Sequence, residues 1–118
     1  MQLTITSRGK PHRFTVEVAR TPEEQQLGLM NRASLAPDRG MIFPMEPPRD
    51  ASFWMKNTRI PLDMIFVRAD GRIANIAANT VPLSLEPVPS DGPVKAVLEI
   101  AGGRAAELGI QPGDTVKW

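Results

Sequence analysis

The residues best suited to chemistry are concentrated in one short run, FWMKNTRIPLDMIF, from Phe53 to Phe66. This run contains an indole, an ammonium group, an amide, a hydroxyl and a carboxylate. An indole beside hydrogen-bond donors is typical of a surface that binds a small ligand, because the ring gives a flat apolar platform and the donors fix the orientation of the ligand. The other interpretation is that Trp54 is a large core residue and that Lys56 extends past it to water.

Backbone alternation separates the side chains of this run into two faces. If residues 52–58 are extended, one face carries Trp54, Lys56 and Thr58, and the other carries Phe53, Met55 and Asn57. We predict that the first face meets a ligand and that Phe53 and Met55 pack into the core.

The position of Asp63 follows from a predicted hairpin. The pair Asp70-Gly71, flanked by apolar runs, is favoured in two-residue type I′ turns. Counting back from such a turn puts Ile65 opposite Ile76 and puts Asp63 at the end of an apolar face. A carboxylate there must reach solvent, accept hydrogen bonds from nearby backbone N–H groups, or pair with a cation.

Three roles for Asp63 stay open at this point. It pairs with a cation such as Lys56 or Arg32 in a ligand site, or it only organises the turn at residues 59–62. As a third role, Asp63 could act in a hydrolase with Glu99 or Lys56. Asp63 and Glu99 both lie in otherwise apolar strands, where burial can raise the pKa of a carboxyl group.

Four methionines, Met41, Met45, Met55 and Met64, fall on segments that we expect to be neighbouring strands. Thioethers are soft ligands that suit Cu(I), and they are also adaptable core fillers. The chain has no cysteine and only one histidine, His12, so core filling is the better interpretation. We predict no metal site and no cofactor.

Sequence pattern also predicts the elements that position these residues. The segment Thr21–Glu24 (TPEE) predicts the capped start of a helix over about residues 21–30, and a glycine-closed segment predicts a short helix over about 102–108. Apolar and alternating runs predict strands at residues 2–7, 12–19, 41–45, 63–68, 73–80, 94–100 and 115–118. We therefore predict one compact α+β domain over residues 1–118, with a mostly antiparallel sheet that is curled or barrel-like.

Composition excludes several classes of function. The 118 residues, 42% of them hydrophobic, fit a single globular domain. The net charge of +1 comes from charges spread along the chain, so we expect no nucleic-acid binding through bulk charge. No apolar run is long enough to span a membrane, and residues 1–8 show no signal-peptide pattern. The absence of cysteine excludes disulfides and thiolate chemistry.

Four segments together resemble the domain-of-unknown-function 192 family, also called uncharacterised protein family 0127. These segments are Thr21–Arg32 (TPEEQQLGLMNR), Gly40–Phe43 (GMIF), Phe53–Phe66 and Val97–Val116 (VLEIAGGRAAELGIQPGDTV). The resemblance covers nearly the whole chain. It implies a bacterial or archaeal protein with a periplasmic or otherwise extracytoplasmic location, and it implies no particular activity.

The resemblance also places the chemically notable residues inside the motifs of the family. The predicted ligand-binding residues are Met30, Arg32, Trp54, Lys56, Asn57, Thr58 and Asp63. In this prediction Trp54 is the platform, Lys56 and Arg32 are cationic donors, and Asn57, Thr58 and Asp63 fix orientation. No catalytic residue is predicted.

The leading hypothesis is a non-enzymatic extracytoplasmic binding module for a small polar or anionic ligand, such as a sugar or a cell-envelope component. It is expected to be a monomer or a weak homo-oligomer. The first alternative is the hydrolase described above, which requires its acidic groups to converge in one pocket. The second alternative is a structural or protein-interaction domain, which predicts an exposed apolar patch in place of a pocket.

Overall fold

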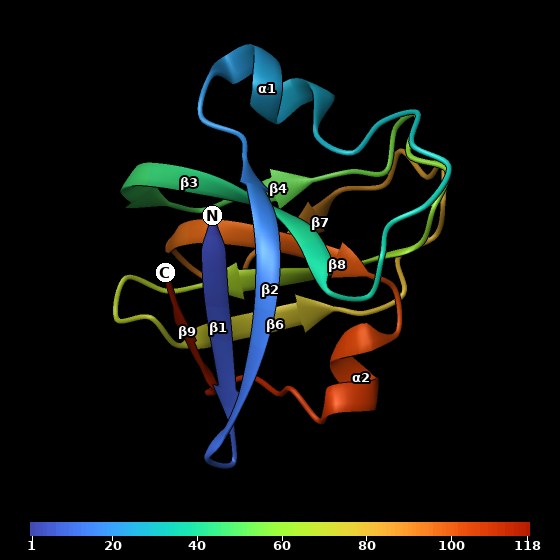
Figure 1. The fold of residues 1–118 in the computed structure, drawn as a ribbon. Coiled ribbons are helices and arrows are strands. Elements are labelled where there is room, and N and C mark those ends of the chain that lie inside the picture. Colours follow the sequence, from blue (N-terminus) through green and yellow to red (C-terminus); the bar gives the residue numbers. More distant parts are fainter.

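The computed structural model describes residues 1–118, which form a strongly curved sheet with two short helices (Figure 1). Seven strands make up the main sheet, in the order β6-β5-β8-β3-β2-β1-β9. Their bounds are β1 Gln2–Ser7, β2 Lys10–Val18, β3 Arg39–Arg49, β5 Leu62–Val67, β6 Ile73–Ala77, β8 Val94–Ala101 and β9 Thr115–Lys117. A separate two-stranded sheet pairs β4 (Ser52–Phe53) with β7 (Val88–Pro89). The helices are α1 (Pro22–Leu27) and α2 (Arg104–Leu108).

The main sheet curls until its far parts meet. All neighbouring strands are antiparallel except β2 and β3, which are parallel. The turn between β5 and β6 reaches the edge strand β9, where the Val116 N–H donates to the Gly71 carbonyl at 2.8 Å and Arg72 pairs with Thr115. The predicted α+β domain with a curled, barrel-like and mostly antiparallel sheet is therefore confirmed.

Two apolar clusters lie on opposite faces of the three central strands β3, β8 and β5. The first cluster, on the inner face of the curled sheet, includes Ile42, Ile65 and Leu98. The second cluster includes Met64 and Phe43 and lies on the other face. Because both faces of these strands are covered, β5 is buried along its whole length and shows no polar alternation. All four methionines considered above as metal ligands or core fillers lie in the second cluster as buried core residues.

Helix α1 begins as predicted and ends earlier than predicted. Thr21 and Glu24 form a reciprocal capping box at its start. The helix stops at Leu27 because Gly28 takes a positive φ of +49°, which ends the helical hydrogen bonding. The backbone of Gly28 then passes close to the Phe43 ring, where an added Cβ would lie 3.4 Å from a ring carbon. The expected extension of the helix to residue 30 is therefore wrong.

The hairpin between β5 and β6 is also built differently from the predicted two-residue turn. The Gly71 N–H donates to the Arg68 carbonyl at 2.9 Å and Gly71 has φ +85°, so a turn is followed by a glycine bulge. The predicted pairing of Ile65 with Ile76 is correct, because the register shift lies between Phe66 and the turn.

Neither helix has the length or apolar character that crossing a bilayer requires.

The run that contains Trp54 is extended only at its beginning. Strand β4 ends at Phe53, and a turn follows in which Asn57 has φ +53°. The turn buries Thr58 and exposes Asn57, so the strict alternation predicted over residues 52–58 is wrong beyond Lys56. The proline-rich connection after β6 is irregular, apart from the two residues of β7.

Candidate functional site: a cleft beneath helix α1

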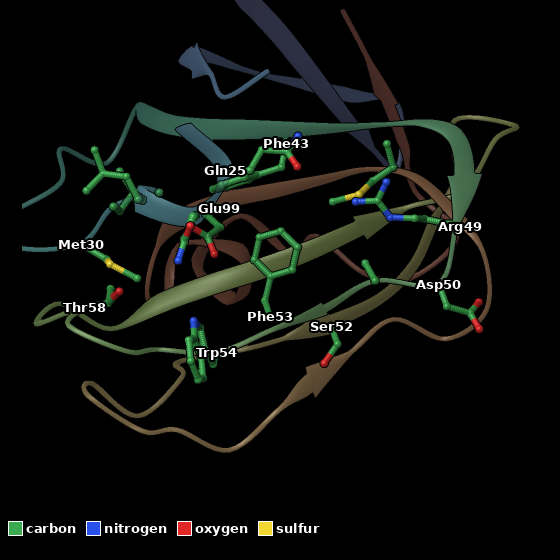
Figure 2. Close-up of a pocket in the computed structure, with 16 residues that line it drawn as sticks. Gln25, Met30, Phe43, Arg49, Asp50, Ser52, Phe53, Trp54, Thr58 and Glu99 are labelled. Carbon is green, nitrogen blue, oxygen red and sulfur yellow. The ribbon is translucent and has the colours of Figure 1, made fainter. Parts of the chain in front are cut away.

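A cleft of about 360 Å³ opens between α1 and the turn after it on one side and strands β3 and β4 on the other. Its volume lies in the range of small-molecule sites, roughly 300 to 1,000 Å³. Apolar and polar side chains line it in about equal number. Figure 2 shows how its labelled side chains are distributed. At one end lie Met30, Thr58, Trp54 and Glu99, at the other Arg49 and Asp50, and the Phe53 ring lies between them.

Glu99 lies within the second apolar cluster and lines this cleft. On β8 it pairs directly with Met41 of β3 on one side and with Met64 of β5 on the other, so its side chain shares their face. Glu99 is only 4% exposed. Burial among these apolar neighbours disfavours the charged form and raises the pKa of the Glu99 carboxyl to about 8.

No protein group donates a hydrogen bond to the Glu99 carboxyl. Every fully enclosed polar side-chain atom of the chain has a partner, so the unpartnered Glu99 oxygens must be open to the cavity that Glu99 lines. Because these oxygens have no protein donor, their hydrogen-bond partner must come from the cavity, as water or a ligand. Binding of a ligand at this point would provide one.

Aromatic rings form the wall beside Glu99. The Phe53 ring packs edge-on against Phe43, with ring centroids 4.9 Å apart, and against Phe66 at 6.4 Å. Trp54 lies at the rim, 46% exposed, with the Lys56 ammonium 5.2 Å from its ring centroid. The cleft thus has an apolar interior and an exposed indole at its entrance.

Two polar side chains in the wall have already used their donors. Both N–H groups of the Gln25 amide are taken, one by the Ala19 carbonyl at 3.0 Å and the other by the Pro44 carbonyl at 2.9 Å. The hydroxyl of Thr58 donates to the Lys56 carbonyl at 3.1 Å. Consequently Gln25 and Thr58 offer oxygen acceptors to the cleft, as Glu99 does.

Asp63 lies away from the cleft and has a complete set of partners. Its side chain is fully buried on the opposite face of β5 from Met64, because it pairs with Ile100, whereas Met64 pairs with Glu99. Its carboxylate accepts three backbone hydrogen bonds, from the N–H groups of Asn79 at 2.8 Å, Gly103 at 3.0 Å and Ala105 at 2.8 Å. Asp63 therefore joins the loop after β6 to the start of α2, and none of its donors belongs to the turn at residues 59–62.

The remaining predicted residues divide into two groups. Lys56 and Asn57 line a shallower hollow that shares Trp54 and Met30 with the cleft. Arg32 lies elsewhere and forms an ion pair with Glu17, whose carboxylate oxygen accepts from the Arg32 Nη2 at 3.0 Å. This ion pair lowers the pKa of the Glu17 carboxyl.

The structure thus gathers part of the predicted site and adds residues that sequence reasoning did not assign to it. Met30, Trp54 and Thr58 line the cleft, whereas Arg32 and Asp63 do not. The cleft residues that the prediction missed include Glu99, Phe53 and Gln25. A signal for Glu99 was present, since a lone carboxyl in an apolar strand is unusual, but its neighbours across β3 and β5 are not readable from the sequence.

Fold and cleft together define a small α+β domain with a curled sheet and a side cleft whose floor carries a buried carboxyl. Comparison with known families then shows that the chain belongs to domain of unknown function 192, described as an "Uncharacterized ACR", which matches residues 3–118. A comparison with curated proteins gives no match.

Two solved structures are similar over almost the whole chain. A protein of unknown function from Novosphingobium aromaticivorans DSM 12444 is 54% identical, with a TM-score of 0.98, and the match covers 100% of this chain and 84% of that one. A protein from Sinorhizobium meliloti 1021, described as a proposed transcription regulator, is 42% identical with a TM-score of 0.95, and the match covers 98% of this chain and 91% of that one.

Proposed function

We propose that this protein is a non-enzymatic binding module that holds a small polar ligand in the cleft beneath α1. The observation that supports this most directly is the unpartnered Glu99 carboxyl open to a cavity of about 360 Å³. A ligand with one polar group and an apolar body fits best, because the polar group would meet Glu99 while the body lies against Phe53 and Trp54. An anionic ligand is less well supported, since Arg32 lies outside the cleft and Lys56 lies only beside its rim.

The hydrolase alternative requires Asp63 to converge with Glu99 or Lys56. Asp63 and Glu99 lie on opposite faces of the central strands. The Asp63 carboxylate already accepts three backbone hydrogen bonds, which leaves it poorly suited to act as an acid, base or nucleophile. We likewise do not extend the regulator description of the Sinorhizobium protein to this chain, because a net charge of +1 gives little attraction for nucleic acid.

A thermal-shift screen with two tryptophan variants tests the binding proposal. Trp54→Ala removes the rim of the cleft, and Trp118→Ala is the matched control. Trp118 is similarly exposed, at 43%, and has its own lysine over the ring at 4.8 Å, but it does not line the cleft. A ligand specific to the folded state raises the midpoint of unfolding. We expect hits that stabilise the wild type and Trp118→Ala and lose at least half their shift with Trp54→Ala. If the library gives no such hits, or if the thermal shift of each hit falls equally in both variants, the cleft is not the binding site.

A protein-interaction function is the second candidate, because the loop after β6 exposes three large apolar side chains, Val81, Leu83 and Leu85. Backbone hydrogen bonds fix this loop beside the Trp54 segment, including one from the Leu83 N–H to the Thr58 carbonyl at 3.0 Å. A double change of Leu83 and Leu85 to Ser tests it by sedimentation velocity. Self-association of the wild type that disappears in the double variant would favour this function, and a concentration-independent monomer would not.

We further propose that the module works outside the cytoplasm, on the family resemblance alone. Fractionation of a native host that produces the full-length natural protein tests this. Release with periplasmic or envelope markers is expected, and exclusive recovery with a cytoplasmic marker would reject it.

A further inference from the structure

Side-chain hydrogen-bond acceptors predominate at the Glu99 end of the cleft, where the indole N–H of Trp54, which has no partner in the protein, is a donor at the rim. The Gln25 amide uses both N–H groups on backbone carbonyls, and the Thr58 hydroxyl uses its proton on another. Their oxygens, with those of Glu99 once that carboxyl is ionised, remain as acceptors for a ligand. A group rich in donors and without acceptors complements such a site, and an ammonium, with three donors and no acceptor, is of this kind.

The aromatic and charged residues around the cleft favour the same chemistry. Aromatic faces attract cations, and Phe43, Phe53 and Trp54 all line the cleft, although the Lys56 ammonium already lies over the Trp54 ring. Apart from Glu99, the charged residues that line it are Arg49 and Asp50, which Figure 2 shows at the opposite end. None of the other strand or helix residues lining the cleft, from α1, β3, β4 or β8, carries a titratable side chain.

We propose that the cleft is selective for small organic cations, with Glu99 accepting hydrogen bonds from an ammonium group and the aromatic wall holding the apolar body of the ligand. This proposal rests on the binding function proposed above and names its ligand class. The carboxyl must be ionised to pair with the cation, so binding releases the carboxyl proton to solvent and leaves an ammonium–carboxylate pair. Burial, which raises the pKa of Glu99 to about 8, makes this release necessary at neutral pH.

Three probes of similar shape and different charge test the ligand class. Phenethylammonium is the cation, 2-phenylethanol the neutral analogue and 3-phenylpropionate the anion. Calorimetric titrations of the wild type at pH 8 should show the cation binding at least tenfold more tightly than either analogue. Equal or tighter binding of the alcohol or the propionate overturns the proposal, and so does failure of the cation to bind at millimolar concentration.

The pH dependence gives a second test that does not need a variant. Alkylammonium groups stay protonated to about pH 10, so Glu99 is the group that titrates in the experiment. Affinity for the cation should rise by up to about tenfold per pH unit from pH 6 to about 8 and then level off. Binding heats measured in buffers of different ionisation enthalpy should report a proton released at pH 7. Affinity that is flat or falls over this range overturns the proposal.

Glu99→Gln keeps the shape of the side chain and removes the charge, and Trp118→Phe is the control that also leaves Trp54 as the single indole reporter. We expect the first variant to lose at least tenfold in affinity for phenethylammonium and the second to lose none. Neutral compounds could quench Trp54 fluorescence in Trp118→Phe and bind Glu99→Gln as tightly as the wild type. That result would overturn cation selectivity and leave the binding function intact. If Trp54→Ala weakens the binding of no compound of any charge, the binding function itself fails.

Discussion

Asp63 and Glu99 are two buried carboxyls on neighbouring strands that differ in nearly every other respect. Asp63 faces the inner cluster and accepts three backbone hydrogen bonds. Glu99 faces the second cluster, lines a cleft and accepts none from the protein. Both are almost inaccessible to solvent, at 0% and 4% exposure. The contrast shows that burial of an acid does not define its role, because the available donors decide whether the group supports the fold or is left for a ligand.

The largest expected effect comes from removing the satisfied carboxylate. Asp63→Ala leaves three backbone N–H groups without their acceptor, those of Asn79, Gly103 and Ala105. Unsatisfied buried donors cost about 1 to 3 kcal/mol each before relaxation, so we expect a loss of about 3 to 5 kcal/mol in the free energy of unfolding. Urea denaturation followed by circular dichroism measures it.

Asp70→Ala is the control for this change, because Asp70 is exposed and accepts a single turn bond from the Arg72 N–H at 2.9 Å. We expect it to cost less than about 1 kcal/mol. If the two aspartate variants are equally stable, the hydrogen bonds of Asp63 do not hold the β6 loop and α2 in place as described.

A second expected effect is a pH dependence of stability that Glu99 contributes. Below the ordinary carboxyl pKa of 4.5 the folded and unfolded chains both hold the proton. Between pH 4.5 and about 8 the unfolded chain releases it while the folded chain keeps it, so the Glu99 contribution to the free energy of unfolding falls as pH rises. The slope is at most about 1.4 kcal/mol per pH unit, and above pH 8 it vanishes.

The Glu99 contribution is isolated by measuring the free energy of unfolding against pH for the wild type and for Glu99→Gln, and subtracting one curve from the other. Glu99→Gln cannot ionise, so the difference between the wild type and this variant should change steadily from pH 4.5 to 8 in favour of the variant. Unfolding curves in urea at half-unit pH steps measure it. A difference that stays constant with pH would mean that the Glu99 carboxyl is ionised normally in the folded chain.

Matched amide substitutions at a single pH test whether the two carboxyls affect the free energy of unfolding in opposite directions. At pH 8, Asp63→Asn puts an NH₂ group against the backbone donor of Ala105 or of Asn79 and Gly103, and we expect a loss of about 1 to 3 kcal/mol. Glu99→Gln removes the need to bury a charge and has no bond to lose, so it should leave stability unchanged or raise it. Losses of the same sign and size in both variants would remove the distinction between the two carboxyls.

Sequence reasoning reached the fold more fully than the site, and the reasons are physical. Local signals determined the capping box at Thr21 and the pairing of Ile65 with Ile76, because both depend on residues close in the chain. The partners of Asp63 come from residues 79–105, and their approach depends on the closure of the sheet. A lone acid in an apolar strand can be recognised, but its donors cannot be.

The candidate site shows the same limit. Trp54 is predicted to be the platform of a ligand site because an indole beside a lysine is a local pattern, and the structure places it at the rim of the cleft. Arg32 was assigned to the site because it lies in a shared motif, yet it pairs with Glu17, which is distant in sequence and lies on β2. The strand parity used for residues 52–58 failed where Asn57 adopts a positive φ, since one turn residue reverses the alternation beyond it.

Loss of the Arg32–Glu17 ion pair has the smallest expected effect on stability. Glu17 is a third kind of carboxyl, partly exposed and paired with a cation. Both side chains are partly exposed, so we expect Arg32→Ala to cost only about 0.2 to 1 kcal/mol at pH 7. Because the pair lowers the pKa of Glu17, this contribution is present above pH 4.5 and is lost as pH falls through the folded pKa, the opposite of the Glu99 trend. Urea unfolding at pH 7 and pH 3, with and without 0.5 M salt (roughly a 4 Å screening length), measures it, with Arg8→Ala on the β1–β2 turn as the control for loss of a surface charge. A salt-insensitive cost above about 2 kcal/mol, or any loss of cleft binding, would mean that Arg32 supports the site after all.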